Sequence, residues 1–267
     1  MNGLLADKVA VIYGGGGAIG GATAKVFARE GARVYLAGRT AAKLERTAAQ
    51  IRDAGGDVSV ATVDVFDEAA VQRHVDGIAA ETGGIDILFN GIGITHVQGK
   101  SFTDTSLSEF ELPVTLTVRS QFIPAQAVAR HMVARKSGVI LTLTTPGGRM
   151  AGTGFLSNGV FSAATEAFSR LLAAELGRDG IRVVCLRPDA IPEATALSHA
   201  NEVFEGVAQR AGTTVHKMLD EHARNNTLLG RLPRLGEVAE CAAFAASDRA
   251  GPITGAILNL TCGSLVD

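Results

Sequence analysis

Residues 8–20 are Lys8-Val9-Ala10-Val11-Ile12-Tyr13-Gly14-Gly15-Gly16-Gly17-Ala18-Ile19-Gly20, a short apolar run that leads into glycines and then into a helical pattern. A strand that turns into a helix through glycines exposes backbone amides and a helix N-terminus to a pyrophosphate without side-chain obstruction. A glycine-rich loop alone is a weak signal, because it also serves as an ordinary strand-to-helix turn. Here it opens the first βαβ unit of a predicted parallel sheet, and we therefore predict a nucleotide site.

Short β-rich runs alternate with longer helical patterns along the whole chain, which indicates parallel strands joined by helical crossovers. Several runs are continuously apolar, as expected when helices cover both faces of a sheet. We predict an α/β fold: a single-domain, Rossmann-like, doubly wound parallel sheet of about seven strands with helices on both faces. The predicted strands span residues 8–13, 33–38, 57–63, 86–90, 138–144, 181–186 and 256–260, and the predicted helices span 20–30, 41–54, 67–81, 107–136, 158–178 and 237–247.

The segment from about residue 191 to 235 has a helical pattern but no strand, and it is richer in polar residues. We interpret it as a helical lid inserted before the last helix and strand. A chain of 267 residues is within the size range of one undivided α/β domain, so we predict a single NAD(P)-binding domain over residues 1–267 with this segment covering the substrate.

Composition excludes several classes of function. The net charge is −2 with interspersed signs, which argues against nucleic acid and anionic membranes as partners. No basic leader precedes an apolar stretch, and no run of about 18 uncharged apolar residues occurs, so we expect a cytoplasmic protein. The three cysteines are widely spaced and suit reduced thiols. We predict no metal site and assign no role to three histidines that are too far apart for a close metal motif: His199, His216 and His222.

The connection after the second predicted strand, Ala37-Gly38-Arg39-Thr40, bears on nucleotide preference. A small residue stands where a carboxylate would bind the adenosine ribose diol, and a guanidinium follows it. Arginine binds a phosphate through its planar fork, so Arg39 favours a 2′-phosphate and hence NADP(H) over NAD(H). The alternative is a solvated arginine at the start of a helix.

The glycine run resembles the Thr-Gly-x-x-x-Gly-x-Gly motif of the short-chain dehydrogenase/reductases, with Tyr13 for Thr, Ala18 for the middle Gly, and Gly14 and Gly20 kept. Similar stretches follow later strands: Asp64-Val65, Asn90-Gly91-Ile92-Gly93, and segments at residues 138–145, 171–184 and 229–263. The resemblance thus covers nearly the whole chain. It implies cofactor contacts at Gly14, Gly16, Gly17, Ala18, Ile19, Gly20, Arg39, Asp64, Val65, Asn90, Gly91, Pro188 and Ile191.

The resemblance fails at the family's Tyr-x-x-x-Lys motif. The register set by Glu175-Leu176 places Asn158 and Ser162 at these two positions, and the only tyrosines, Tyr13 and Tyr35, lie in the first two predicted strands. By the same register the family's catalytic Ser becomes Thr145 and its Asn becomes Thr117. The resemblance therefore implies an active site in which all four usual catalytic residues differ.

The side chains that remain offer hydrogen bonds but no acid near neutral pH. Thr145 keeps a hydroxyl, and Asn158 has an amide N–H that can donate to a developing oxyanion. We predict His96 as a replacement general acid, with a solvated loop residue as the alternative. Arg149 and Asp189 also follow strands; Asp189 either orients a cationic substrate or caps a turn.

Three functions remain open. The first is an NADP(H)-dependent oxidoreductase with a non-standard site, acting on a small imine, enone or carbonyl compound. The second is a catalytically silent nucleotide-binding homologue that acts as a sensor or partner subunit. The third is a lyase, isomerase or dehydratase that keeps the nucleotide as a structural element. In each case a homodimer or homotetramer is the expected assembly.

Overall fold

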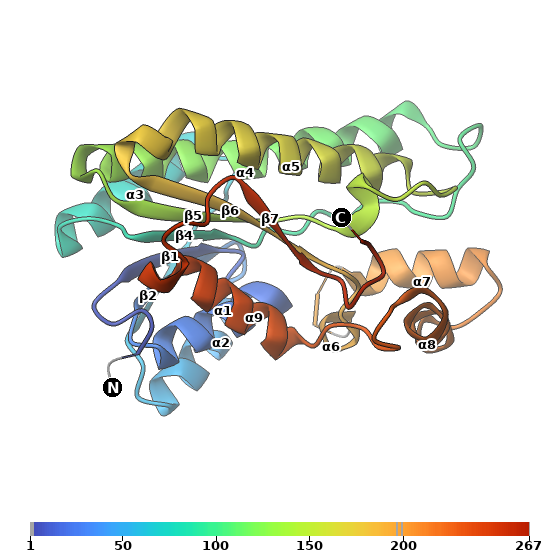
Figure 1. Cartoon of the computed structure of the whole chain (residues 1–267), viewed down its shortest axis with the longest axis horizontal. Coiled ribbons are helices and arrows are strands. Elements are labelled where there is room, and N and C mark those ends of the chain that lie inside the picture. The colour runs from blue at the N-terminus through green and yellow to red at the C-terminus, as the bar shows by residue number, and fades with distance from the viewer. Residues whose placement is uncertain (1–2, 196, 199, 267) are drawn as a thin grey trace.

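The computed structural model describes residues 3–195, 197–198 and 200–266, and it shows one parallel sheet with helices on both faces (Figure 1). The order of the strands is β3-β2-β1-β4-β5-β6-β7, and every pair is parallel. This arrangement confirms the predicted fold class. The strands are β1 (Val9–Tyr13), β2 (Arg33–Gly38), β3 (Val58–Thr62), β4 (Ile87–Asn90), β5 (Gly138–Leu143), β6 (Ile181–Pro188) and β7 (Ala256–Leu260).

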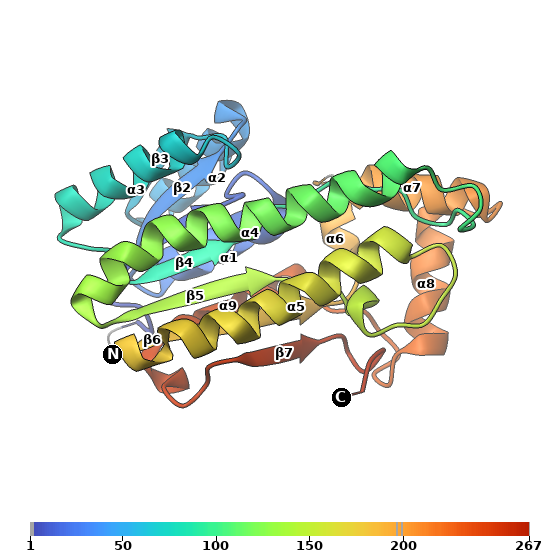
Figure 2. The same cartoon turned by 90° about the horizontal axis from the view of Figure 1, so that it is seen from above.

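Helices on either side of the sheet form two outer layers (Figures 1 and 2). One face of the sheet is covered by α1 (Ala18–Arg29), α2 (Ala41–Asp53) and α9 (Leu235–Ala246). The other face is covered by α3 (Glu68–Thr82), α4 (Leu107–Arg135) and α5 (Leu156–Leu176). Short 3-10 turns occur at η1 (Pro146–Gly148), η2 (Gly177–Asp179) and η3 (Asp248–Ala250).

Local sequence sets several helix boundaries. Asp67 accepts a hydrogen bond from the Ala70 amide at the start of α3, and Gly83 ends this helix in a left-handed conformation. Ser106 and Glu109 form a reciprocal capping box at the start of α4. Such caps satisfy amides and carbonyls that a helix leaves without partners at its ends, and this is why the long crossovers start and stop where they do.

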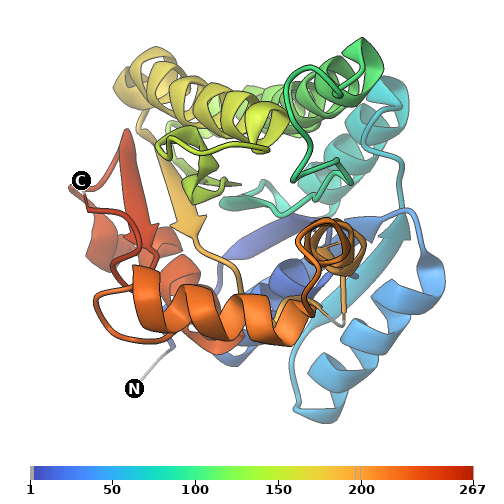
Figure 3. The same ribbon diagram turned by 90° about the vertical axis from the view of Figure 1, so that its right-hand side faces the viewer.

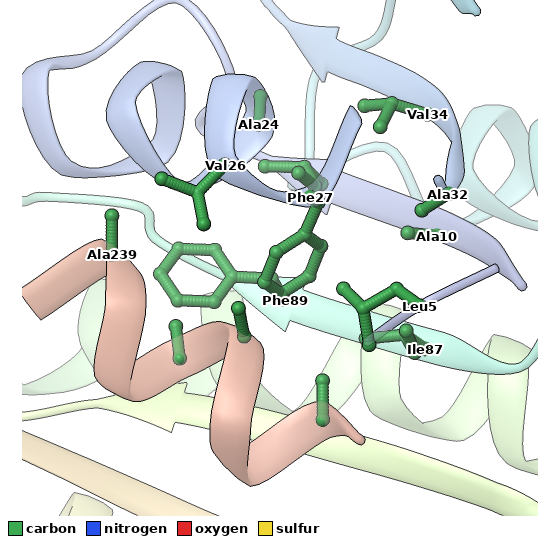
Figure 4. Close-up of a cluster of buried hydrophobic side chains, with 14 of the residues drawn as sticks. Leu5, Ala10, Ala24, Val26, Phe27, Ala32, Val34, Ile87, Phe89 and Ala239 are labelled. Carbon is green, nitrogen blue, oxygen red and sulfur yellow. The ribbon is translucent and has the colours of Figure 1, made fainter. Parts of the chain in front are cut away.

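An apolar core lies between the sheet and the helices α1 and α9. It packs against the strands whose carboxyl ends form the cleft. Phe27 of α1 and Phe89 of β4 meet edge to face with ring centroids 6.4 Å apart, and both are fully buried (Figure 4). Small residues of α9 such as Ala239 and Ala242 let this helix lie close to α1. The packing therefore holds the first and fourth strands in register at the point where each one ends.

Most predicted boundaries lie within two residues of the observed ones, and the differences have structural causes. β6 continues to Pro188, two residues beyond its predicted end, because Arg187 and Pro188 pair with Asn259 and Leu260 of β7. Both α1 and α5 begin two residues before their predicted starts, so α5 already includes Leu156 and Ser157.

The segment predicted as a lid contains three helices: α6 (Pro192–Thr195), α7 (Ala200–Arg210) and α8 (Val215–Asn226). They lie beyond the carboxyl ends of the strands, across the same edge of the sheet as the glycine run (Figures 2 and 3). In the part of the chain that the structure describes, no helix is long and apolar enough to span a membrane.

Candidate active site

A cleft of about 810 Å³ lies at the carboxyl ends of the strands. Its walls come from the glycine run, from the ends of β2, β4, β5 and β6, from the start of α5, and from the lid helices. In doubly wound sheets this edge is where ligands bind, because the connections diverge to opposite faces there. The cleft is large enough for a nucleotide and a small substrate together.

The glycine run forms a cradle that side chains would fill. Gly14 has a φ of +79°, and a Cβ there would lie 2.6 Å from the Gly91 carbonyl oxygen. A Cβ on Gly20 would lie 2.3 Å from the carbonyl oxygen of Gly14. Gly17 caps α1 without a side-chain hydrogen bond, so the first amides of this helix remain available to a ligand. This geometry fits a dinucleotide pyrophosphate.

Most residues that the sequence associates with the cofactor lie on the cleft wall. These are Gly14, Gly16, Gly17, Ala18, Ile19, Arg39, Val65, Gly91, Pro188 and Ile191. Three others are not among the residues that line the cleft. Gly20 allows the loop to pack closely, exposed Asp64 accepts a hydrogen bond from the Phe66 amide at 3.1 Å, and buried Asn90 donates to the Ser120 carbonyl at 2.6 Å. Asn90 thus links β4 to α4.

A second cation lies beside Arg39. Lys43, in the first turn of α2, lines the same end of the cleft, and Thr40 lies between the two. Sequence reasoning missed this residue. The signal was its position four residues after Arg39 at a helix start. The described lining at this end contains no carboxylate.

The predicted catalytic residues meet in one hydrogen-bonded cluster. The Thr145 hydroxyl donates to Asn158 Oδ1 at 3.1 Å, lies 2.8 Å from Ser162 Oγ, and accepts from the Gly147 amide at 3.2 Å. Asn158 Nδ2 lies 3.3 Å from His96 Nε2. Ser162 is fully buried beneath this cluster. Thr117 lines the same cleft from α4, but none of these hydrogen bonds reaches its side chain.

The hydrogen bonds of His96 define its protonation state. Nδ1 lies 2.9 Å from the Ile94 carbonyl oxygen, which only accepts, so Nδ1 carries a hydrogen. Nε2 lies within hydrogen-bond distance of two side-chain amides, those of Asn158 and Gln98. Both amides can donate to Nε2 when the ring is neutral. The Phe161 ring packs edge-on against the His96 ring, with the ring centroids 5.0 Å apart. Burial of the imidazole lowers the pKa of His96.

A neutral His96 does not fit the predicted role of general acid. An imidazole whose remaining lone pair accepts two amide hydrogens has no proton to give at Nε2. Its effect in this geometry is on orientation: by accepting from Asn158 Nδ2 it turns the Asn158 oxygen toward Thr145. His96 therefore acts on the site as a hydrogen-bond acceptor that fixes an amide.

Gln98 belongs to this cluster and sequence reasoning missed it. Its Nε2 lies 2.7 Å from His96 Nε2, and the residue is buried in the cleft wall. The Arg210 guanidinium of α7 donates to the Gln98 carbonyl oxygen, which ties this loop to the lid. The only signal in the sequence was a polar side chain two residues after His96.

Asp189 anchors the lid. His222 Nε2 of α8 lies 2.9 Å from its Oδ2, the Ser264 hydroxyl donates to the same oxygen, and the Ala190 amide donates to Oδ1 at 2.7 Å. Burial raises the pKa of Asp189, but the hydrogen bonds outweigh it and hold the pKa below its ordinary value. The hydrogen bond to Asp189 in turn raises the pKa of His222.

This anchor corrects two expectations. Asp189 has three donors and is not free to orient a cationic substrate. His222 is a half-buried contact between lid and sheet, whereas His216 is exposed beside Asp220. Arg149 is exposed and is not among the cleft-lining residues, and His199 lies outside the described residues. The described residues contain no group of His, Cys, Asp and Glu side chains that could hold a metal ion.

Neither tyrosine takes part in the hydrogen-bonded cluster around Asn158. Tyr13 lines the cleft, but its hydroxyl lies 3.0 Å from His74 Nδ1, and burial raises its pKa. Tyr35 lies in β2 with the Arg33 guanidinium 5.3 Å from its ring.

The fold agrees with the comparisons with known proteins. A family model described as enoyl-(acyl carrier protein) reductase matches residues 16–264, and the chain belongs to the short-chain dehydrogenase/reductase family. Among its relatives, a 3-oxoacyl-(acyl-carrier-protein) reductase of Chlamydia trachomatis serovar D is 30% identical, over 98% of this chain and 99% of the relative. The (+)-borneol dehydrogenase 2 of Salvia officinalis is 30% identical, over 94% of this chain and 87% of the relative.

The crystal structure of NAD+-bound xylitol dehydrogenase is similar throughout. It is 25% identical to this chain with a TM-score of 0.87, and the match covers 97% of this chain and 99% of the other. The resemblance that the sequence motifs indicated is therefore confirmed at the level of family and fold.

We expect the ring of His96 to be neutral, with its hydrogen on Nδ1, at all pH values above about 6.5. Heteronuclear NMR of the histidine ring nitrogens measures this directly. Gln98→Glu should raise the pKa of His96, because a carboxylate beside Nε2 favours the imidazolium. Gln98→Leu removes the donor without adding charge and serves as the control.

The same shift has a consequence for stability. The pKa of His96 is lower in the folded chain than in the unfolded chain, so the unfolded chain takes up the proton first and the fold loses stability as pH falls below about 6.5. A wild-type His96 that titrates at its ordinary value would contradict the hydrogen-bond assignment.

Proposed function

We propose that the protein is an NADP(H)-dependent oxidoreductase that transfers a hydride to or from a small carbonyl, imine or enone compound. The observation that carries this proposal is the fixed amide of Asn158, which is held between Thr145 and His96 on the wall of the cleft. When bound, the nicotinamide cofactor supplies the hydride chemistry. The residues of this chain bind and orient the substrate.

The hydrogen bonds of Asn158 determine what the site offers to a substrate. Its Oδ1 accepts from Thr145, and one Nδ2 hydrogen points to His96. A side-chain amide nitrogen carries two hydrogens, so the second remains for a substrate oxygen. A preorganised N–H of this kind stabilises negative charge that develops on oxygen during hydride transfer.

The same cluster provides no proton for the substrate. Thr145 donates its hydrogen to Asn158, His96 is neutral, and an amide is not an acid near neutral pH. Substrates that need little proton delivery fit such a site best. An iminium is already charged, and a conjugated enone accepts hydride to give an enolate that hydrogen bonds stabilise. We therefore place imines and enones ahead of simple ketones.

The preference for NADP(H) rests on charge at the adenosine end of the cleft. Arg39 and Lys43 both line it, and Gly38 stands where a carboxylate would bind a ribose diol. Two cations and no described carboxylate favour a 2′-phosphate over a hydroxyl pair. We also propose that residues 191–235 act as the lid of one NAD(P)-binding domain, since α7 and α8 line the cleft.

The alternative is a nucleotide-binding homologue without turnover, acting as a sensor or partner subunit. The absence of a proton donor in the cluster favours it. The two functions differ in one measurement: both require nucleotide binding, and only the oxidoreductase consumes NADPH with a substrate.

We expect NADPH to bind more tightly than NADH in calorimetric titration. Arg39→Ala should weaken NADPH binding by about 10- to 100-fold, the effect of losing one charged hydrogen-bonding group, and leave NADH binding nearly unchanged. Arg46→Ala, an exposed position on α2 outside the described cleft lining, is the matched control. Equal losses for both nucleotides in Arg39→Ala would argue against recognition of the 2′-phosphate.

We expect Asn158→Ala to lower kcat by about 100-fold or more on an imine or enone substrate, with a smaller change in KM. The reason is the loss of a donor that acts mainly on the developing oxyanion. Ser157→Ala is the control, because this buried neighbour does not line the cleft. Nucleotide binding without turnover on any imine, enone or carbonyl compound would support the silent alternative.

We further propose that the chain assembles through the exposed faces of α4 and α5. A shallow groove between these helices is lined largely by apolar residues such as Phe122, Phe168 and Leu172. Phe122 is 48% exposed, and Leu171 beside the groove is 68% exposed. Large apolar side chains in such a continuous patch are typical of an interface.

We expect sedimentation velocity of the wild type to show a dimer or tetramer, and Phe122→Glu with Leu171→Glu to show a smaller species. Burying two carboxylates in an apolar interface without partners is strongly unfavourable. Leu228→Glu, at a position 78% exposed near the lid, is the control. A wild-type monomer would sink the assembly proposal.

A further inference from the structure

Charge is distributed unevenly along the cleft. Among the described lining residues, the ionisable ones are Tyr13, Arg39, Lys43, His96, Asp189, Glu221 and His222. The two permanent cations, Arg39 and Lys43, both lie at the connection from β2 to α2, where the nucleotide is proposed to bind. The described ionisable residues that line the end of the cleft near the lid are His96, Asp189, Glu221 and His222.

Helix α7 lies directly beside the catalytic cluster. A Cβ on Gly99 would lie 3.7 Å from Val207, and Arg210 of the same helix binds the carbonyl oxygen of the neighbouring Gln98. The lid residues that line the cleft are therefore close to His96 and Asn158. Most of them are apolar, and we call this set the lid wall: Leu197, Val203, Phe204, Val207, Met218 and Leu219.

The wall opposite the lid is apolar too. Phe155 and Phe161, at the start of α5, line the cleft together with Met150. Phe161 lies against His96, so apolar surface reaches the hydrogen-bonding cluster itself. A substrate held between these walls with one oxygen or nitrogen at Asn158 is surrounded mainly by hydrocarbon.

The ionisable groups at the lid end offer nothing to an anion. Asp189 and Glu221 are carboxylates, a positive charge on His222 is paired with Asp189 at 2.9 Å, and His96 accepts at Nε2. The Arg210 guanidinium binds a backbone carbonyl and is outside the described lining. A phosphate or carboxylate on the substrate would lose hydration there without gaining a cationic partner, which is strongly unfavourable.

We propose that the site takes a largely hydrocarbon enone, imine or ketone without an anionic group and rejects substrates that carry a phosphate or carboxylate. The proposal rests on the proposed function for the position of the reacting group. The selection against anions depends only on the lid wall and the charges around it. Binding and turnover can therefore be tested separately.

The first experiment compares matched ligands, 4-methylcyclohex-2-enone and its 4-carboxylate analogue. Binding is measured by displacement of a fluorescent apolar probe from the protein, with and without NADPH, and turnover by NADPH consumption. We expect the neutral enone to bind at least 100-fold more tightly than the carboxylate. Equal or tighter binding of the carboxylate would overturn the proposal. Selective binding of the neutral enone without turnover would uphold it and count against the oxidoreductase.

The second experiment adds a cation to the lid wall. Val207→Lys should weaken binding of the neutral enone by about tenfold or more and improve binding of the carboxylate. Gln209→Lys adds the same charge at an exposed position of α7 outside the described lining and should change neither. Thermal melts of both variants check folding. A similar gain for the carboxylate in Gln209→Lys would show that net charge, not the lid wall, controls selection.

Discussion

Backbone packing at the carboxyl ends of β1 and β4 is the constraint on which the site depends. Gly14 and Gly91 approach so closely that a single methyl group on Gly14 would lie 2.6 Å from a carbonyl oxygen. This contact brings the glycine cradle beside the loop that starts at Gly91 and carries His96. The glycine cradle and the cluster around His96 are therefore neighbours, because glycine at positions 14 and 91 lets the two strand ends approach closely.

The hydrogen-bonded cluster around His96 connects the proposed site of hydride transfer to the lid. His96 fixes the Asn158 amide, Gln98 shares the same imidazole nitrogen, and Arg210 of α7 holds the Gln98 backbone. On the other side, Asp189 binds His222 of α8. Helices α7 and α8 are thus attached to the rest of the fold through charged or polar groups, while most of their cleft-lining side chains are apolar. The residues that attach the lid are therefore different from the residues through which the lid faces the cleft.

Family membership favours an oxidoreductase, whereas the lack of a proton donor in the cluster favours a homologue without turnover. Hydride transfer needs an acceptor stabilised at its polar atom, and one N–H of Asn158 provides that. Proton delivery needs an acid, and the hydrogens of Thr145 and His96 are already committed to protein acceptors. The proposed function therefore suits substrates whose reduction is limited by hydride transfer, in a cleft whose cations lie at one end and whose lid wall is apolar.

The sequence by itself determined the fold and the nucleotide end of the cleft, because both depend on local patterns. Apolar runs of strand length, helical periodicity and the glycines at residues 14–20 are each visible within a short window. Thr145, Asn158 and Ser162, which the family register selects, are hydrogen-bonded to one another in the structure, since all three lie on adjacent segments of one β-α unit.

Only the tertiary structure decided what these residues do. His96 and Asn158 are 62 positions apart, and Asp189 and His222 are 33 apart, so no local pattern reports their contacts. The tautomer of His96 depends on the Ile94 carbonyl and on the burial of the ring, which exist only after the loop folds against α5. Protonation and charge complementarity follow from three-dimensional surroundings, and for that reason the hydrogen bonds of His96 could not be read from the sequence.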